Sequence, residues 1–234
     1  MALKQQSLVT QSSSVITKIQ PAVKDSQRVN IFLDQKFSFS LTLAELLDTK
    51  LQVGQTLSSG QLQELKSLSQ FGKLYQRALE RLTARPFSVK EMYDYLRRKQ
   101  FRRESSLRLH PESSIPLITN QQIEAVITKL LDQHYLDDYR FAIYYLEHRR
   151  QRQGISQRRL KLELLKKGIS QSIIQELLDT PTSLRQDCTE IQKLLNKKRR
   201  LKSYDQKKLI QYLVRQGFDY ELAQNSVLEM DSQN

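Results

Sequence analysis

Basic side chains are the residues of this sequence whose type and spacing point to a chemistry, and that chemistry is the binding of negatively charged partners. They gather in three clusters: Arg97 to Lys99 with Arg102 and Arg103; Arg149, Arg150 and Arg152 with Arg158, Arg159 and Lys161; and Lys197 to Arg200 with Lys202. One such cluster alone is best interpreted as a solvated helix face that keeps the protein soluble. A binding surface is indicated only if the cations recur at equivalent positions.

The cations do recur, because three segments align without a gap behind the helix-capping residues Ser88, Ser156 and Asp205. The second position after the cap is basic in each segment, where the helix dipole opposes a cation by roughly 0.3 to 1 kcal/mol. The third position is Glu91 in the first segment, which can form a capping box with Ser88, but Arg159 and Lys208 in the others. Local stability therefore does not explain these cations. The basic tenth position (Arg98, Lys166, Arg215) lies in the last turn, where the dipole does explain it.

We therefore predict that the N-terminal ends of these helices, above all at Arg158 and Arg159, face an acidic partner. The predicted contact residues are Lys90, Arg97, Arg98, Arg149, Arg150, Arg152, Arg158, Arg159, Lys161, Lys207 and Lys208.

The sequence contains no residue pattern that indicates phosphate-loop, metal-binding or catalytic chemistry. Gly54 and Gly60 are wrongly spaced for a phosphate-binding loop, and the three histidines lack a carboxylate or cysteine at ligand spacing. The pair Asp137 and Asp138 is interpreted as a helix cap and dipole complement in preference to a metal site. The single Cys188 is interpreted as a small, partly buried hydrophobe. We expect no catalytic set, no metal and no cofactor, and hence a protein that is not an enzyme.

The aligned segments also predict the helices that position the cations. Each has a buried apolar pair one turn apart (Met92 and Leu96, Leu160 and Leu164, Leu209 and Leu213), and each closes with a small or polar residue followed by an apolar one (Gln100–Phe101, Gly168–Ile169, Gly217–Phe218), as a helix C-cap does. A second cap follows (Thr119, Ser170, Asp219), with apolar residues four and eight positions on. Upstream, Ala78, Leu146 and Leu195 match in a preceding helix. The repeat is therefore three helices long, and copies should stack.

The predicted fold is mainly α, with tandem three-helix repeats in an elongated stack and a small N-terminal α+β module. Residues 1–14 are predicted to be a disordered tail. The module spans 15–70, with strands at 15–19, 28–33 and 37–41, a turn at 34–36, a helix at 43–50 and another from about 61. The repeats span 71–133, 134–180 and 181–234, and the first holds an inserted loop at 102–117.

The formal net charge of +13 draws a protein of 234 residues toward polyanions or acidic protein surfaces. No apolar run approaches the roughly 20 residues that cross a bilayer, and the polar start lacks the centre of a signal peptide. We therefore expect a cytosolic monomer with no membrane contact.

Three segments carry a resemblance to a known family: Arg77 to Phe101, Ile127 to Ile169 and the strand segment Arg28 to Leu41. Through these residues the chain resembles the RecX family of bacterial recombination regulators, and the strand segment looks like the N-terminal extension of some members. The most specific parts are Tyr135 to Ala142 and Arg152-Gln-Gly154 followed by Arg158, Leu160 and Leu164. Residues 187–230 match weakly and are assigned through the repeat, and the 102–117 insertion departs from the family's usual short connection.

The resemblance implies a curved stack of repeats that lies in the helical groove of a RecA filament on single-stranded DNA. There it would slow ATP hydrolysis and strand exchange and favour disassembly, with ATP turned over by RecA. The alternative is an autonomous basic DNA-binding protein whose cations contact the phosphates of single- or double-stranded DNA directly. Whether the N-terminal module binds RecA, DNA or neither stays open.

Overall fold

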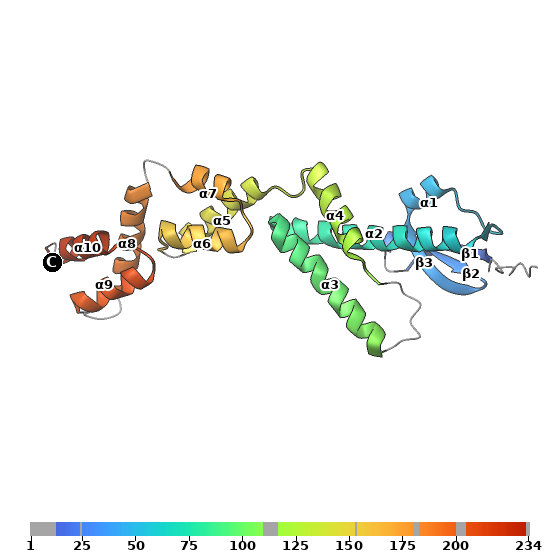
Figure 1. The fold of residues 1–234 in the computed structure, drawn as a ribbon, viewed down its shortest axis with the longest axis horizontal. Helices are drawn as coiled ribbons and strands as arrows, with labels where there is room; N and C mark the ends of the chain where they lie inside the picture. The colour runs from blue at the N-terminus through green and yellow to red at the C-terminus, as the bar shows by residue number, and fades with distance from the viewer. Residues whose placement is uncertain are drawn as a thin grey trace, which may run out of the picture. The chain divides into compact units, whose positions relative to one another are not determined.

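A computed structural model of the chain describes residues 13–23, 25–109, 117–152, 154–179, 183–199 and 205–232. Within these ranges, four strands and ten helices follow in the order β1, β2, β3, α1, β4 and α2 to α10 (Figure 1). They form two compact units, each treated by itself below. The first contains the described residues of Met1–Arg81 and Tyr95–Thr128, and the second those of Leu82–Asp94 and Lys129–Asn234. The mainly helical fold with a small N-terminal sheet is confirmed.

The N-terminal sheet is antiparallel and has the strand order β3-β2-β1-β4. Its strands are β1 (Ser14–Ala22), β2 (Asp25–Leu33), β3 (Lys36–Thr42) and β4 (Thr56–Leu57). The turn between β2 and β3 is made by Asp34 and Gln35 with positive φ of 48° and 65°, which suits a right-twisted hairpin. The three predicted strands are confirmed. Strand β4 was missed because two residues carry no periodicity.

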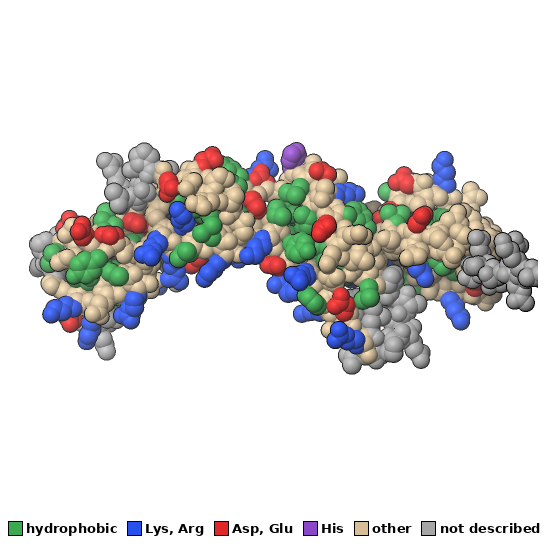
Figure 2. Space-filling view, viewed as in Figure 1, with side chains coloured by type: hydrophobic (Ala, Val, Ile, Leu, Met, Phe, Trp, Pro, Cys, Tyr) green, Lys and Arg blue, Asp and Glu red, His purple; other side chains and the backbone are tan. Residues whose placement is uncertain are grey.

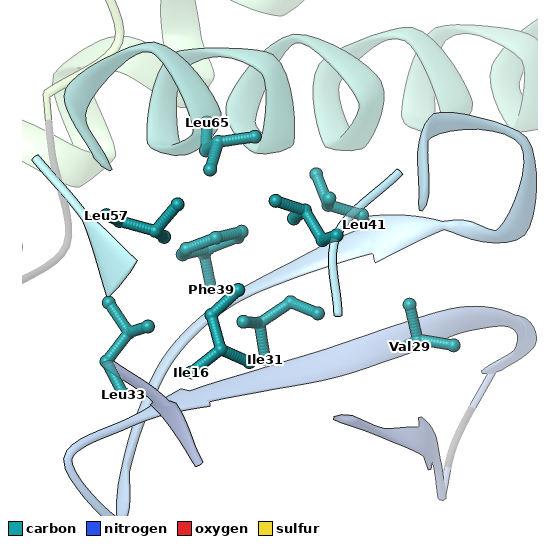
Figure 3. Close-up of a cluster of buried hydrophobic side chains, with 9 residues drawn as sticks. Ile16, Val29, Ile31, Leu33, Phe39, Leu41, Leu57 and Leu65 are labelled. Carbon is teal, nitrogen blue, oxygen red and sulfur yellow. The ribbon is translucent and has the colours of Figure 1, made fainter. Parts of the chain in front are cut away.

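One face of the sheet carries the core of the module (Figure 3). Alternate residues of β2 and β3 point into it, together with Ile16 of β1, Leu57 of β4 and Leu65 of α2. Helix α1 (Leu43–Thr49) packs on the sheet and begins with a capping box between Thr42 and Glu45. The alternating apolar residues Val29, Ile31, Leu33, Phe39 and Leu41 are buried, whereas Phe37 is 52% exposed because the pairing of β2 with β3 shifts register next to it.

Helix α2 (Ser59–Ala84) runs without a break across the boundary predicted between residues 70 and 71. It begins behind Ser58, which exchanges hydrogen bonds with Gln61 as in a capping box. It ends at Ala84, because Pro86 disfavours helix at the preceding Arg85. The last helix of the module and the first helix of the first repeat are therefore one helix.

The predicted loop at 102–117 is wrong over its first half, because α3 (Val89–Leu109) continues through Phe101. Gln100 stands where the other repeats have glycine and does not end the helix. Its side-chain amide instead donates to Ile118 O and to Asn120 Oδ1, at the start of α4 (Asn120–Asp132). Phe101 is consequently 52% exposed instead of buried. Residues 110–116 lie outside the described ranges.

The second and third repeats contain α5 (Asp138–Arg152), α6 (Gln157–Lys166) and α7 (Gln171–Leu178), then α8 (Ser183–Arg199), α9 (Gln206–Arg215) and α10 (Tyr220–Ser232). Each set of three encloses its own apolar core. Every apolar position predicted from the repeat, except Phe101, is buried. Of the predicted tail 1–14, residues 1–12 lie outside the described ranges, whereas Ser14 begins β1 and pairs with Leu57, so the tail was predicted too long. Residues 180–182, at the predicted boundary between the second and third repeats, also lie outside the described ranges.

The middle helices α6 and α9 end as predicted, in a glycine with left-handed backbone followed by a buried apolar residue. Gly168 and Gly217 have φ of 85° and 94°. Ile169 N–H donates to Leu164 O at 3.1 Å, and Gly168 N–H donates to Leu165 O at 3.0 Å. These two bonds form a Schellman motif, and its counterpart follows Leu213.

Successive repeats meet at two equivalent joints, where the C-terminus of one middle helix abuts the N-terminus of another. At the first joint, the Ser88 hydroxyl accepts from Glu91 N–H and donates to Lys167 O at 2.7 Å. Asp138 at the start of α5 also accepts from Val89 N–H at 2.9 Å. Val89 N–H at the N-terminus of α3 and Lys167 O at the C-terminus of α6 thus both have hydrogen-bond partners.

The second joint repeats this pattern between α6 and α9. Ser156 accepts from Arg159 N–H and donates to Gln216 O at 2.9 Å, while Asp187 of α8 accepts from Gln157 N–H at 2.9 Å. Both cap serines are fully buried. Asp137 caps its own helix through Tyr139 and Arg140 N–H, so the capping role predicted for the Asp pair is confirmed, although Asp138 serves the neighbouring repeat.

Replacing Ser156 with Ala should lower the free energy of unfolding by roughly 2 to 3 kcal/mol, because the cap and the bond to Gln216 O are both lost. Ser170→Ala is the matched control, since Ser170 is exposed and caps only its own helix, and should cost about 1 kcal/mol. Urea denaturation of both variants measures the difference. Equal losses would show that the joint contributes nothing.

Gly217→Ala should destabilise the protein more than Gly54→Ala, although both glycines have left-handed backbone. A Cβ at Gly217 would lie 2.7 Å from Ser156 Oγ, whereas a Cβ at Gly54 meets nothing within 4 Å. Backbone strain costs about 1 kcal/mol at either position, so any excess at Gly217 reports the close approach of α9 to α6. Thermal unfolding of the two variants makes the comparison.

Candidate partner-binding site

The middle helices α6 and α9 of the second unit carry many more cations than acids. Helix α6 has four cations and one acid, and α9 has Lys207, Lys208 and Arg215 with no acid. By contrast, the only charged residue of α7 is Glu176, and α10 has no Lys or Arg. Figure 2 shows blue side chains gathered over α6 and α9, with most of the red ones toward α7 and α10. The repeats therefore have a basic and an acidic side.

The joints account for part of this basic character. Lys90 Nζ, at the N-terminus of α3, donates to Lys166 O at 3.1 Å. The end of α6 thus supplies the negative pole that α3 itself lacks at this point. Glu91 forms ion pairs with Arg85 at 2.9 Å and with Lys167. Burial acts to raise the pKa of Glu91, but the hydrogen bonds from these two cations outweigh it and lower the pKa.

Arg159 occupies the position of Glu91 at the second joint and is likewise used within the chain. Its guanidinium donates to Gln216 Oε1 and to Glu163 Oε1, the latter at 3.4 Å. Gln216 stands where the first joint has Lys167, so an ion pair at one joint corresponds to an Arg–Gln hydrogen bond at the other. The choice of cation at Lys90 and Arg159 therefore has a structural reason that the sequence did not reveal.

Glu163 is the centre of a polar cluster on α5 and α6. Arg149 donates to it through Nε at 2.8 Å and Nη2 at 2.7 Å, and Tyr145 Oη donates at 2.9 Å. The Arg149 hydrogen bonds lower the pKa of Glu163 against the effect of burial. Burial and the bond to Glu163 raise the pKa of Tyr145. Arg149 is thereby neutralised inside the repeat, and Arg150 donates to Gln186 Oε1 of α8 at 2.9 Å.

The remaining predicted residues differ in their exposure. Arg158, Lys207 and Lys208 in the second unit are exposed, and no ion pair involves them among the described residues. Lys161 is half-buried. Arg97 and Arg98 are exposed in the first unit, where Arg97 lies over the Phe101 ring at 5.6 Å. The Arg152 side chain is outside what the structure describes. The exposed cations that can meet a partner are fewer than the sequence clusters suggested.

Sequence reasoning missed Asp138, Asp187 and Glu163 as partners of the basic helices. The four-residue spacing of Arg159 and Glu163 was a readable signal for one pair. Nothing in the local sequence links Asp138 to Val89, which lies 49 residues away.

A metal site among the residues that the structure describes would need a group of His, Cys, Asp or Glu side chains. No three His, Cys, Asp or Glu side chains come together as metal ligands there. Cys188 is a free thiol of intermediate exposure. Among the helices described, none has an apolar stretch long enough to pass through a lipid bilayer.

Glu163→Gln should reduce the free energy of unfolding near pH 7 by roughly 1 to 2 kcal/mol, after allowance for partial solvent exposure of the cluster. Folding lowers the pKa of Glu163 from its ordinary 4.5. Its stabilising effect is therefore present above that value and is lost as the pH falls through the folded-state pKa. Urea titrations at about pH 7 and pH 3 should show the variant and parent converging at the acidic end. Glu147→Gln, at an exposed residue of α5, is the control. A difference that persists at the acidic end would contradict the role of the charge.

Two comparisons at the level of domains agree with this architecture. Residues 14–58 match the family model described as the regulatory protein RecX N-terminal domain. Residues 137–178 match the RecX second three-helix domain. The first match covers β1 to β4 and the second covers α5 to α7, which carry the Glu163 cluster and Arg158.

Whole-chain comparisons extend the similarity to the remaining repeats. The chain is 30% identical over 223 residues to the regulatory protein RecX of Bacillus licheniformis and to that of Bacillus subtilis, covering 94% of this chain and 78% of each relative. A crystal structure of a regulatory protein RecX has the same fold, with a TM-score of 0.65 at 22% identity, covering 94% of this chain and all of the other. RecX from Lactobacillus salivarius gives a TM-score of 0.50 at 26% identity over 69% of this chain and 96% of that chain. From the joints, the repeat and these similarities together, the chain belongs to the RecX family of regulatory proteins.

Proposed function

We propose that this protein regulates the RecA recombinase by binding RecA filaments on single-stranded DNA. It occupies the filament groove, slows ATP hydrolysis and strand exchange, and favours disassembly. Membership of the RecX family supports the choice of RecA as target. The observation that carries the proposal is the exposed set Arg158, Lys207 and Lys208 on helices whose neighbours α7 and α10 carry no cation.

The joints explain how a chain of short helices can present these cations to a long, regular partner. Because the hydrogen bonds of the second joint connect α6 to α9, equivalent positions of the second and third repeats recur at a fixed relation. Arg158 and Lys207 are such equivalent positions. A filament offers negative charge at a regular repeat, so a matching array binds it in several places at once.

The action is steric and electrostatic. A basic surface steers the protein to a negatively charged partner, and the resulting association weakens as salt screens the charges. A bound protein then obstructs movement of the filament subunits. RecA itself turns over the ATP, so this chain supplies no group to the reaction.

Arg158→Glu should raise the concentration of protein that half-inhibits RecA ATPase by about five- to tenfold, because an exposed attractive charge becomes repulsive. Adding Lys207→Glu should raise it further. Arg140→Glu is the matched control: Arg140 is also an exposed arginine, with 78% of its side chain exposed, but it lies on α5 beside Asp137, and we expect less than about a twofold change. Thermal unfolding verifies that each variant is folded. Equal effects of Arg158→Glu and Arg140→Glu would refute a specific basic surface.

The same assay separates filament regulation from direct DNA binding. Inhibition by far less protein than is needed to coat the DNA supports action on the filament. Inhibition only when the DNA is saturated, with Arg158→Glu weakening naked-DNA binding by the same factor, would instead indicate an autonomous DNA-binding protein.

A further inference from the structure

The first unit contains a cavity that none of the contacts described above uses. It lies between strand β3 and helix α2 and has a volume of about 220 Å³. Phe39, Leu74 and Ile118 line it with side chains that are at least nine-tenths buried. Phe37 stands at its edge with half of its surface exposed. The cavity therefore has an apolar interior that opens to solvent.

Cations from one stripe of α2 surround this apolar interior. Lys66, Lys73 and Arg77 all line the cavity, and their spacing of seven and four residues places them on the same face of the helix. No Asp or Glu is found among the described residues that line it. The charges of Lys66 and Arg77 are thus not balanced by an acid of the lining, which favours a negatively charged occupant.

The two features together narrow the chemistry of that occupant. The group that enters must be apolar, because a base or other polar ring pressed against Phe39, Leu74 and Ile118 would leave its donors and acceptors unpaired. Two buried polar residues of the lining already have partners: the Ser69 hydroxyl donates to Ser40 O at 2.7 Å, and Gln70 Oε1 accepts from Gln122 Nε2 at 3.0 Å. Nucleic acid supplies the anions but no apolar side group of this size. An acidic peptide with one large apolar side chain supplies both.

The edge of the sheet indicates how such a peptide would be held. In the pairing of β2 with β3, Ile31 lies opposite Phe39 and Phe32 opposite Phe37, so Ser38 is the extra residue of a β-bulge. A bulge interrupts the ladder that an added strand would need. The Ser40 carbonyl already accepts hydrogen bonds from Ser69 Oγ and Arg28 Nη2. Recognition therefore depends on side chains.

We propose that this cavity is a docking site for an acidic peptide segment of a partner protein, which inserts an aromatic or large aliphatic side chain between β3 and α2. Carboxylates on either side of that anchor pair with Lys66 and Arg77. The site lies in the first unit, so it is separate from Arg158, Lys207 and Lys208, and it does not depend on the proposed action on RecA.

The test is fluorescence polarisation of the full chain with a fluorescein-labelled peptide of four aspartates, one phenylalanine and four aspartates. Replacing the peptide phenylalanine with alanine should weaken binding by about tenfold or more, because the anchor is lost. Lys66→Glu with Arg77→Glu should weaken it by about tenfold. Arg102→Glu with Arg108→Glu is the matched control, since both are exposed in the same unit and outside the cavity. It should change binding by less than about threefold.

A second measurement locates the peptide even if a charge-reversal variant fails to fold. The peptide phenylalanine is replaced with p-benzoylphenylalanine, and photo-crosslinks on the unaltered chain should fall within residues 37–39, 66–77 or 118. Crosslinks elsewhere would overturn the proposal. So would equal binding of the phenylalanine and alanine peptides. A fluorescein-labelled oligomer of twelve thymidylates that loses affinity on Lys66→Glu with Arg77→Glu, when the peptides do not, would assign the cavity to nucleic acid instead.

Discussion

A fully buried serine hydroxyl that serves two helices at once is the interaction on which the repeats depend. Ser88 and Ser156 each accept from the N-terminus of their own helix and donate to the last carbonyls of the next middle helix. Buried backbone groups at helix ends must find partners, and one hydroxyl with an aspartate beside it satisfies several of them. The same requirement explains the glycines, since a side chain at Gly217 would collide with Ser156 Oγ.

This contact also decides what the charges do. By bringing the C-terminus of α6 to the N-terminus of α3, the joint gives Lys90 a negative pole that its own helix cannot provide. Arg159 is held by Gln216 and Glu163, and Arg149 by Glu163. Several of the basic side chains are therefore hydrogen-bonded within the chain, where they help to position the helices. The predicted contact residues that stay exposed are Arg97 and Arg98 on α3 and Arg158, Lys207 and Lys208 on α6 and α9.

The third repeat has Asp205 as the cap of its middle helix, where the other two repeats have a serine. Asp205 caps α9 through Lys207 N–H, as the serines cap theirs, but an ionised carboxylate has no proton to donate to another helix end. The N-terminus of α9 is consequently suited to end the series, with Lys207 and Lys208 exposed beside it. The N-terminal module adds a different surface, in which apolar and basic side chains share one cavity.

The sequence by itself determined the helices, their caps and their buried stripes, because capping residues and apolar spacing act within a few residues of one another. Leu160, Leu164 and Gly168 were assigned correctly for this reason. Only the tertiary structure decided that α2 is one helix, that α3 continues through Gln100, and which cations are neutralised. Those outcomes depend on groups far apart in the chain, such as Ser156 with Gln216 and Val89 with Asp138. A local sequence pattern indicates which kinds of group a side chain can bind, whereas tertiary packing determines which of those groups lies close enough to bind it.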